Sequence, residues 1–128
     1  MTNTADHEFL KLIYKGNISE LYTYLRSSNT HPYEIKDYRG YSALHIAALN
    51  NNGNLVRFLI RYVKDIYSND SNKILKKWSE EITDDEHFTC MHFAVFRGNL
   101  KIVKMFVEIG ADVNALNKQG LSVMHIAA

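Results

Sequence analysis

Apolar residues recur at helical spacing through the segment 97–115, which is the most regular part of the chain. The apolar positions are Leu100, Ile102, Val103, Phe106 and Val107, and the polar positions between them are Lys101, Lys104 and Glu108. This pattern predicts an amphipathic helix that begins near Leu100. Gly110 is predicted to end it, because glycine adopts the left-handed conformation that follows many helices. Residues 111–120 are predicted to form an extended turn or β-hairpin.

A shorter apolar segment precedes this helix. Met91, Phe93, Ala94 and Val95 lie between Thr89 and Gly98. Thr89 or its neighbour is predicted to cap a first helix, and Gly98 with Asn99 is predicted to end it. The unit is therefore two short helices followed by an extended turn.

The same unit recurs along the chain. The motif Gly-x-Ser-x-hydrophobic-His occurs at 40–45 and at 120–125, and residues 87–92 repeat it with His87 in place of the glycine and Thr89 in place of the serine. His87 is expected to be strained if its φ angle is positive. An acidic or amide residue stands three positions before each motif, as Asp37, Asp84 and Asn117.

The spacing between units locates an insertion. Asp84 and Asn117 are 33 positions apart, whereas Asp37 and Asp84 are 47 apart, so about 14 residues are inserted in the earlier unit. With Gly53 aligned on Gly98, two of them precede Gly53 and the others follow it. Within the inserted part, residues 72–82 predict a short helix capped by Ser71 or Asn72, with one apolar face made of Ile74, Leu75, Trp78 and Ile82. A buried Trp78 would indicate a structural insertion, and an exposed one an interface.

The repeated residues resemble the ankyrin-repeat family. Ser-x-Leu-His-x-Ala-Ala from Ser42, Gly-Asn-Leu from Gly98, and Gly-Ala-Asp-Val-Asn-Ala from Gly110 follow the family pattern at its period of about 33 residues. The proline that usually follows the first residue of the Thr-Pro-Leu-His motif is replaced by Ala43, Cys90 and Val123. The resemblance implies an all-α fold, an α-solenoid of stacked helix-turn-helix repeats joined by β-hairpin-like loops.

One ankyrin-repeat domain is expected over residues 1–128. Its first repeat, 6–36, lacks the Leu-His-x-Ala motif and carries charges on its outer side, as a capping repeat does. The other repeats are 37–83 with an insertion at about 64–83, the regular unit 84–116, and a truncated unit 117–128. Because the chain stops inside a helical motif, we expect it to be an N-terminal fragment of a longer protein.

Composition adds limits to this prediction. The chain is 46% hydrophobic with a formal net charge of +1, so a core is expected and no global charge attracts nucleic acid or a membrane. A single cysteine, Cys90, forms no internal disulfide and favours a reducing, cytoplasmic location, or the cytosolic face of a membrane protein. No apolar segment approaches the roughly 20 residues of a membrane helix, and the N-terminus lacks a signal-peptide layout.

Three histidines at one motif position suggest a metal site, but the geometry argues against it. His45, His92 and His125 would lie about 10 Å apart on stacked helices, whereas zinc needs nitrogen ligands at about 2.0–2.1 Å. The resemblance implies instead that each imidazole bonds the backbone between neighbouring turns. Cys90 is expected in the core, and the run of Lys73, Lys76 and Lys77 is interpreted as a solvated helix face rather than a phosphate site. Other structural motif residues are Gly98, Gly110, Asp112 and Asn114.

The sequence predicts a protein–protein interaction module with no catalytic residue, metal or cofactor, and no contact with nucleic acid or membrane. A partner segment is expected along the concave surface formed by hairpin tips and first helices. Tyr41, Phe88 and Leu121 hold equivalent positions and should form a row. The full set of candidates is Tyr38, Arg39, Tyr41, Glu86, Phe88, Phe96, Arg97, Lys118 and Leu121. Two alternatives are a recruiting region of a larger enzyme, such as a membrane-bound protein acyltransferase, and an assembly domain of a channel or scaffold.

Overall fold

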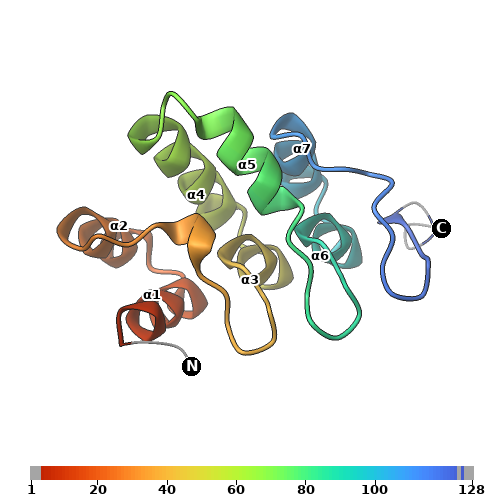
Figure 1. Cartoon of the computed structure of the whole chain (residues 1–128), viewed down its shortest axis with the longest axis horizontal. Coiled ribbons are helices and arrows are strands. Elements are labelled where there is room, and N and C mark those ends of the chain that lie inside the picture. The colour runs from red at the N-terminus through yellow and green to blue at the C-terminus, as the bar shows by residue number, and fades with distance from the viewer. Residues whose placement is uncertain (1–3, 124, 126–128) are drawn as a thin grey trace.

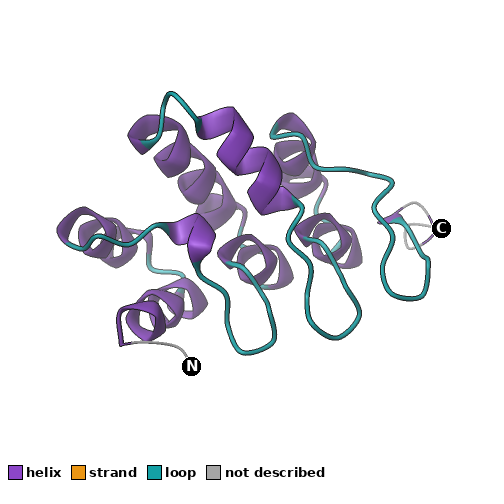
Figure 2. Ribbon diagram, viewed as in Figure 1, coloured by secondary structure: helices purple, strands orange, loops and turns teal. Residues whose placement is uncertain are grey.

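The protein is an all-helical stack in a computed structural model that describes residues 4–123 and 125. Two layers of helices run through it, with extended loops projecting along one edge (Figure 1). No strand occurs among the described residues (Figure 2), and residues Lys36 and Ser42 form one isolated antiparallel bridge. The predicted α-solenoid is confirmed, and the connecting loops are hairpin-like without being regular β-hairpins.

Helices of the first layer are α1 (Thr4–Lys15), α3 (Ala43–Leu49) and α6 (Cys90–Phe96), and those of the second layer are α2 (Ile18–Ser27), α4 (Gly53–Ile66) and α7 (Leu100–Glu108). A short 3-10 helix, η1 (Pro32–Glu34), and the inserted helix α5 (Ser71–Ser79) complete the elements. Each first-layer helix packs on its neighbour, α1 on α3 and α3 on α6. The core lies between the layers, where apolar residues of successive units meet.

Each second-layer helix begins with an asparagine cap. The side-chain oxygens of Asn17, Asn52 and Asn99 accept the backbone N–H of the residue three positions on. The residue before each cap has a positive φ angle, and in the second unit this residue is Asn51 at +57°. Gly53 is therefore the first residue of α4 and does not correspond to Gly98, so the predicted alignment of these glycines is wrong. His45 and Asn51 are six positions apart, as are His92 and Gly98. No residue is therefore inserted between His45 and Asn51, and all the added residues follow Asn51.

Two apolar residues predicted to pack inward along α7 are exposed. Leu100 is 65% exposed and Val107 is 50% exposed, whereas Ile102 and Phe106 are fully buried. The buried face of α7 is therefore narrower than the spacing of its apolar residues predicts.

The insertion forms a longer α4 and the additional helix α5. Helix α5 packs on α4 and against η1 (Figure 1). It spans Ser71–Ser79 rather than 72–82, its N-cap position is Asp70, and Ile82 lies beyond it and is 41% exposed. Trp78 is 2% exposed. A buried Trp78 indicates that the insertion has a structural role rather than forming an interface.

Candidate interaction surface

The first hairpin is shaped by one buried carboxylate. An Oδ1 atom of Asp37 accepts the backbone N–H of Arg39 at 2.8 Å and of Tyr41 at 2.9 Å. Asn117 makes the equivalent bonds to Gln119 and Leu121, at 3.0 and 2.9 Å. These bonds close the loop and fix which side chains stand at its tip.

The hairpin of the third unit is built differently. Thr83, rather than Asp84, holds the position of Asp37, since its N–H donates to the carbonyl of Phe88 and its hydroxyl accepts the N–H of Phe88. This hairpin is one residue longer than the other two. The predicted equivalence of Asp84 to Asp37 is therefore wrong. His87 has φ +57°, in the place that Gly40 and Gly120 occupy with φ +79° and +78°.

Histidine side chains join successive units, as the resemblance implies. His45 Nδ1 accepts the backbone N–H of Ser42 at 3.1 Å, and its Nε2–H donates to the carbonyl of Phe88 at 2.8 Å. His92 repeats this with Thr89 and the carbonyl of Leu121 at 3.2 Å, and His125 Nδ1 accepts the N–H of Ser122. Both nitrogens of His45 and His92 are thus bonded within the protein. Among the described residues, no cluster of histidine, cysteine and carboxylate groups has the layout of a metal site.

Burial favours the neutral imidazoles of His45 and His92. The pKa of His45 is lowered to about 4 because the ring is removed from water, although its bond to the Phe88 carbonyl acts in the opposite direction. Burial also lowers the pKa of His92. A neutral ring is what the observed bonds require, since Nδ1 accepts while Nε2 donates.

Other predicted structural residues are found at turns. Gly98 and Gly110 have φ +67° and +96° where α6 and α7 end, and Asp112 Oδ1 accepts the N–H of Asn114 at 2.8 Å. Cys90 is fully buried, and burial raises the pKa of its thiol to about 12. Such a thiol is an apolar core group rather than a nucleophile at neutral pH.

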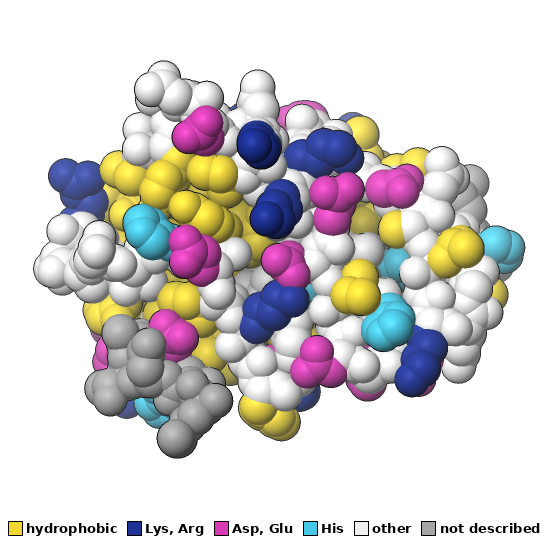
Figure 3. Space-filling model, viewed as in Figure 1, with side chains coloured by type: hydrophobic (Ala, Val, Ile, Leu, Met, Phe, Trp, Pro, Cys, Tyr) yellow, Lys and Arg dark blue, Asp and Glu magenta, His cyan; other side chains and the backbone are white. Residues whose placement is uncertain are grey.

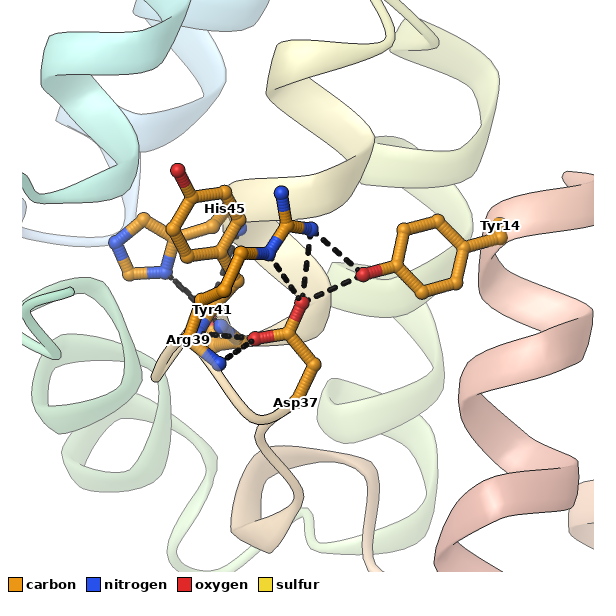
Figure 4. A network of polar contacts seen from close by, with 6 residues as sticks. Tyr14, Asp37, Arg39, Tyr41 and His45 are labelled. Carbon is orange, nitrogen blue, oxygen red and sulfur yellow. Dashed lines mark hydrogen bonds and ion pairs between the residues drawn. The ribbon is translucent and has the colours of Figure 1, made fainter. Parts of the chain in front are cut away.

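A polar network ties the first hairpin to α1 (Figure 4). Asp37 Oδ2 accepts the Tyr14 hydroxyl at 2.5 Å and the Arg39 guanidinium at 2.9 Å, and Arg39 also donates to the Tyr14 oxygen at 2.7 Å. Burial opposes the charge on Asp37, but these bonds and the N–H of Tyr41 outweigh it and lower the pKa of Asp37. Burial, reinforced by Asp37, raises the pKa of Tyr14. Sequence analysis missed Tyr14, which lies in the unit without the repeat motif.

Aromatic rings of neighbouring units meet above this network. The Arg39 guanidinium carbon lies 3.9 Å from the ring centre of Tyr41, within cation–π range. The ring centre of Tyr41 is 5.2 Å from that of Phe93, and Phe88 is 5.6 Å from Phe93 and 5.2 Å from Phe96. Phe93 therefore contacts both Tyr41 and Phe88 of the predicted row. Sequence analysis missed this role because the apolar pattern places Phe93 in the core.

Exposure separates the candidates into two groups. The half-buried group is Arg39, Tyr41, Glu86 and Phe88. The exposed group contains Arg97 and Lys118 together with Tyr38 (86% exposed), Phe96 (48%) and Leu121 (37%). We call the surface that these nine predicted residues share the hairpin surface.

The hairpin tips are bonded to one another. The N–H of Asp84 donates to the carbonyl of Arg39 at 3.0 Å, and the N–H of Lys118 donates to the carbonyl of Glu86 at 2.7 Å. A groove of about 370 Å³ lies between α1 and the first hairpin, where Leu10, Tyr14 and Tyr38 contribute to its walls. Backbone hydrogen bonds therefore connect the hairpin tips, and aromatic side chains of the hairpin surface are exposed beside them.

Comparisons with known proteins agree with the repeat structure. The family model "Ankyrin repeat" matches residues 86–118, and "Ankyrin repeats (many copies)" matches residues 9–60. The chain is 48% identical over 40 residues to Notch-regulated ankyrin repeat-containing protein A of Danio rerio, a match covering 31% of this chain and 36% of that protein. It is 30% identical over 95 residues to the nuclear factor NF-kappa-B p105 subunit of Gallus gallus, covering 73% of this chain and 9% of that protein. The chain thus spans about a third or less of these relatives.

A solved structure has the same fold. It is a chain in the crystal structure of the yeast ribosomal protein Rps3 in complex with its chaperone Yar1, with a TM-score of 0.83 and 23% sequence identity, covering 99% of this chain and 85% of that one. No helix among the described residues is long and apolar enough to cross a membrane.

Proposed function

We propose that this chain, which is an ankyrin-repeat domain, binds a segment of a partner protein along its hairpin surface and catalyses no reaction itself. The observation that carries the proposal is the set of large aromatic side chains left exposed beside hairpins that are hydrogen-bonded to one another. Tyr38 and Phe96 present most or half of their surface to solvent, although each ring would be stabilised by burial. Aromatic residues and arginine dominate the energetics of protein interfaces.

The scaffold supports this use because the surface is preorganised. Phe96 is held against Phe88 and Phe93 by ring contacts, and Arg39 is fixed by Asp37 and Tyr14. Little side-chain freedom is then lost on binding, which favours affinity. Because the Arg39 guanidinium is already bonded to Asp37, we propose that Arg39 contributes a flat stacked surface over Tyr41 rather than a free ion-pairing group.

Charge suggests the character of the partner segment. The hairpin of the third unit holds Asp84, Asp85 and Glu86 at or near its tip. A segment with apolar anchors for the aromatic residues and basic residues toward this hairpin would be complementary. The chain resembles the NF-kappa-B p105 subunit in its repeats and the chain in the yeast chaperone complex in its fold. Neither resemblance identifies a partner of this chain. We also propose a cytoplasmic location, on the basis of the single buried Cys90.

The proposal is tested with peptides selected for binding to the intact 128-residue chain from a random displayed library. Tyr41 and Phe88 also pack inside the protein, so their replacement would disturb the fold as well as the surface. The double variant Tyr38→Ala/Phe96→Ala reduces this problem, because Tyr38 is 86% exposed and Phe96 is 48% exposed. Tyr22→Ala is the matched control, since Tyr22 is 49% exposed on α2.

We expect the double variant to bind the selected peptides at least about tenfold more weakly, which corresponds to about 1.4 kcal/mol, while Tyr22→Ala binds them normally. Fluorescence anisotropy gives both affinities, and circular dichroism shows that the variants are folded. Unchanged affinity in the double variant would rule out the hairpin surface as the binding site.

A further inference from the structure

Charge is distributed unevenly over the molecule although its net charge is only +1. Helices α4, α5 and α7 contain eight of the 15 Lys and Arg residues but two of the 14 Asp and Glu residues, so they carry +6 and the rest of the chain carries −5. Five of the acids lie in residues 80–86. On the face in Figure 3, Lys and Arg side chains gather over α5.

A groove runs between two of these basic helices. Helices α4 and α7 enclose a space of about 320 Å³, with Ile60, Met105 and Ile109 among its lining residues. A second space of about 320 Å³ shares Lys64, Glu108 and Ile109 with the first and extends to α5. The two spaces form one surface feature, which we call the α4–α7 groove. Ile60 and Ile109 are buried and Met105 is partly buried, so the groove has an apolar floor.

Three cations line the groove on one side of α4. Arg57, Arg61 and Lys64 stand at i, i+4 and i+7, which places them along one helix face. All three are exposed, and across the described residues none of them has a carboxylate within ion-pair distance. Like charges at i and i+4 destabilise a helix, so an anionic ligand here would relieve their repulsion.

We propose that the α4–α7 groove binds an acidic amphipathic segment of a partner protein. Apolar side chains of that segment contact Ile60, Met105 and Ile109, and its carboxylates approach Arg57, Arg61 and Lys64. This surface contains none of the residues of the hairpin surface, so the inference is independent of the function proposed above. The groove is a second interaction site on another part of the repeat stack.

The lining residues favour a protein over a nucleic acid. Single-stranded nucleic acids are bound by aromatic side chains on which bases stack, and the residues that line the groove include no aromatic ring. Asp65 and Glu108 also line it and would repel a continuous phosphate backbone. A peptide needs no base stacking, and it can place its spaced carboxylates near Arg57, Arg61 and Lys64 and its apolar residues near Asp65 and Glu108.

The test uses the intact chain and three probes: a fluorescent peptide with Glu and Leu in helical alternation, its Gln/Leu analogue, and single-stranded RNA of equal length. The variant is Arg57→Glu/Arg61→Glu, and Lys11→Glu/Arg26→Glu is the control with the same change in net charge. All four residues are exposed, so both proteins should fold, which circular dichroism and thermal melting check. Anisotropy is measured at low and at physiological salt.

We expect the Glu/Leu peptide to bind, to bind at least tenfold more weakly to the Arg57/Arg61 variant, and to change less than threefold with the control variant. Added salt should weaken its binding, and the Gln/Leu analogue should bind poorly. No binding at low salt, or equal losses with both variants, would overturn the inference. Preferential binding of RNA through Arg57 and Arg61 would overturn it too, because the groove would then be a nucleic-acid site.

Discussion

His45 shows how one side chain connects two repeats. Its ring caps the start of α3 through Ser42 and reaches the backbone of the next hairpin at Phe88. Both bonds require the neutral ring with its proton on Nε2. Protonation would place a charge in a fully buried position and would break the bond from Ser42. The stability of the stack therefore depends on the ionisation of this residue.

The first prediction is a loss of stability on mild acidification. The pKa of His45 is about 4 in the folded protein against an ordinary value of 6.5, so the unfolded chain binds more protons between these values. Stability is then full above about pH 6.5 and falls as the pH drops toward 4. We expect about 2 kcal/mol less unfolding free energy at pH 5 than at pH 7 from His45, with His92 acting in the same direction. Urea unfolding at the two pH values measures this.

The matched variant for this prediction is His45→Gln, which retains polar atoms but does not titrate. Its loss of stability between pH 7 and pH 5 should be clearly smaller than that of the unmodified chain. Asp37 does not complicate the comparison, because its pKa is lowered below 3.8 and its contribution is lost only at more acidic pH. An equal pH dependence in both proteins would show that His45 is not the titrating group.

The second prediction concerns backbone strain at His87. Its φ of +57° lies in the left-handed region, which costs a side chain-bearing residue about 1–2 kcal/mol. His87→Gly should raise the unfolding free energy by roughly 0.5–1 kcal/mol, since the greater freedom of glycine in the unfolded chain offsets part of the gain. Asn51→Gly should gain less, because asparagine tolerates this region. Thermal melts of both variants test the order.

Residue roles could be predicted where a motif recurs and not elsewhere. The bonds of His45 and His92 follow from their repeated position, and the positive φ of His87 follows from the glycines it replaces. Tyr14 could not be found, because its unit lacks the motif and its partner Asp37 lies 23 positions away. Thr83 was missed because its hydroxyl, rather than a carboxylate, accepts the N–H of Phe88, as Asp37 accepts that of Tyr41. The hairpin is also one residue longer, which shifts the equivalent position.

Among the elements, α5 is the departure from a regular repeat. It is anchored by Trp78 and Leu75, which are 2% and 1% exposed. The indole Nε1 of Trp78 is buried without a hydrogen-bond partner among the described residues. The packing of the ring must therefore outweigh the cost of an unsatisfied donor, which is about 1–3 kcal/mol.

The third prediction separates these two contributions to the stability of α5. Trp78→Ala should lower the unfolding free energy by about 3–5 kcal/mol, because it leaves a large cavity. Trp78→Phe should cost much less, under about 1.5 kcal/mol, because it retains most of the packing and removes the unsatisfied N–H. Urea unfolding followed by circular dichroism measures both variants. Similar losses in the two would show that the ring is not tightly packed.

The existence of each α-helix could be predicted from periodicity, but the 3-10 helix η1 and the register between units could not. Gly53 was aligned on Gly98 because both precede Asn-Leu. The asparagine cap of α4 is instead Asn52, and the left-handed residue before it is Asn51. Asparagine also adopts a positive φ angle, so the position of a glycine alone does not identify the left-handed residue of this unit. The end of α5 was likewise placed too late, because Ile82 continues the apolar spacing although it is exposed.

At the scale of the whole molecule, stacking creates properties that no single unit has. The hairpins are bonded tip to tip, through Asp84 to Arg39 and through Lys118 to Glu86, and Tyr41 and Phe88 from successive units meet on Phe93. Composition predicted no strong field, yet the stack brings the basic faces of α4, α5 and α7 together. A net charge near zero therefore conceals two regions of opposite sign.

Binding of a protein segment to the hairpin surface is the function proposed for this chain. The most direct measurement is an amide chemical-shift map of the ¹⁵N-labelled chain, titrated with a peptide selected for binding to it. We expect the largest shifts at residues 38–41, 86–88 and 96–97, with little change along α4 and α7. Shifts confined to α4 and α7, or spread evenly over the chain, would contradict it.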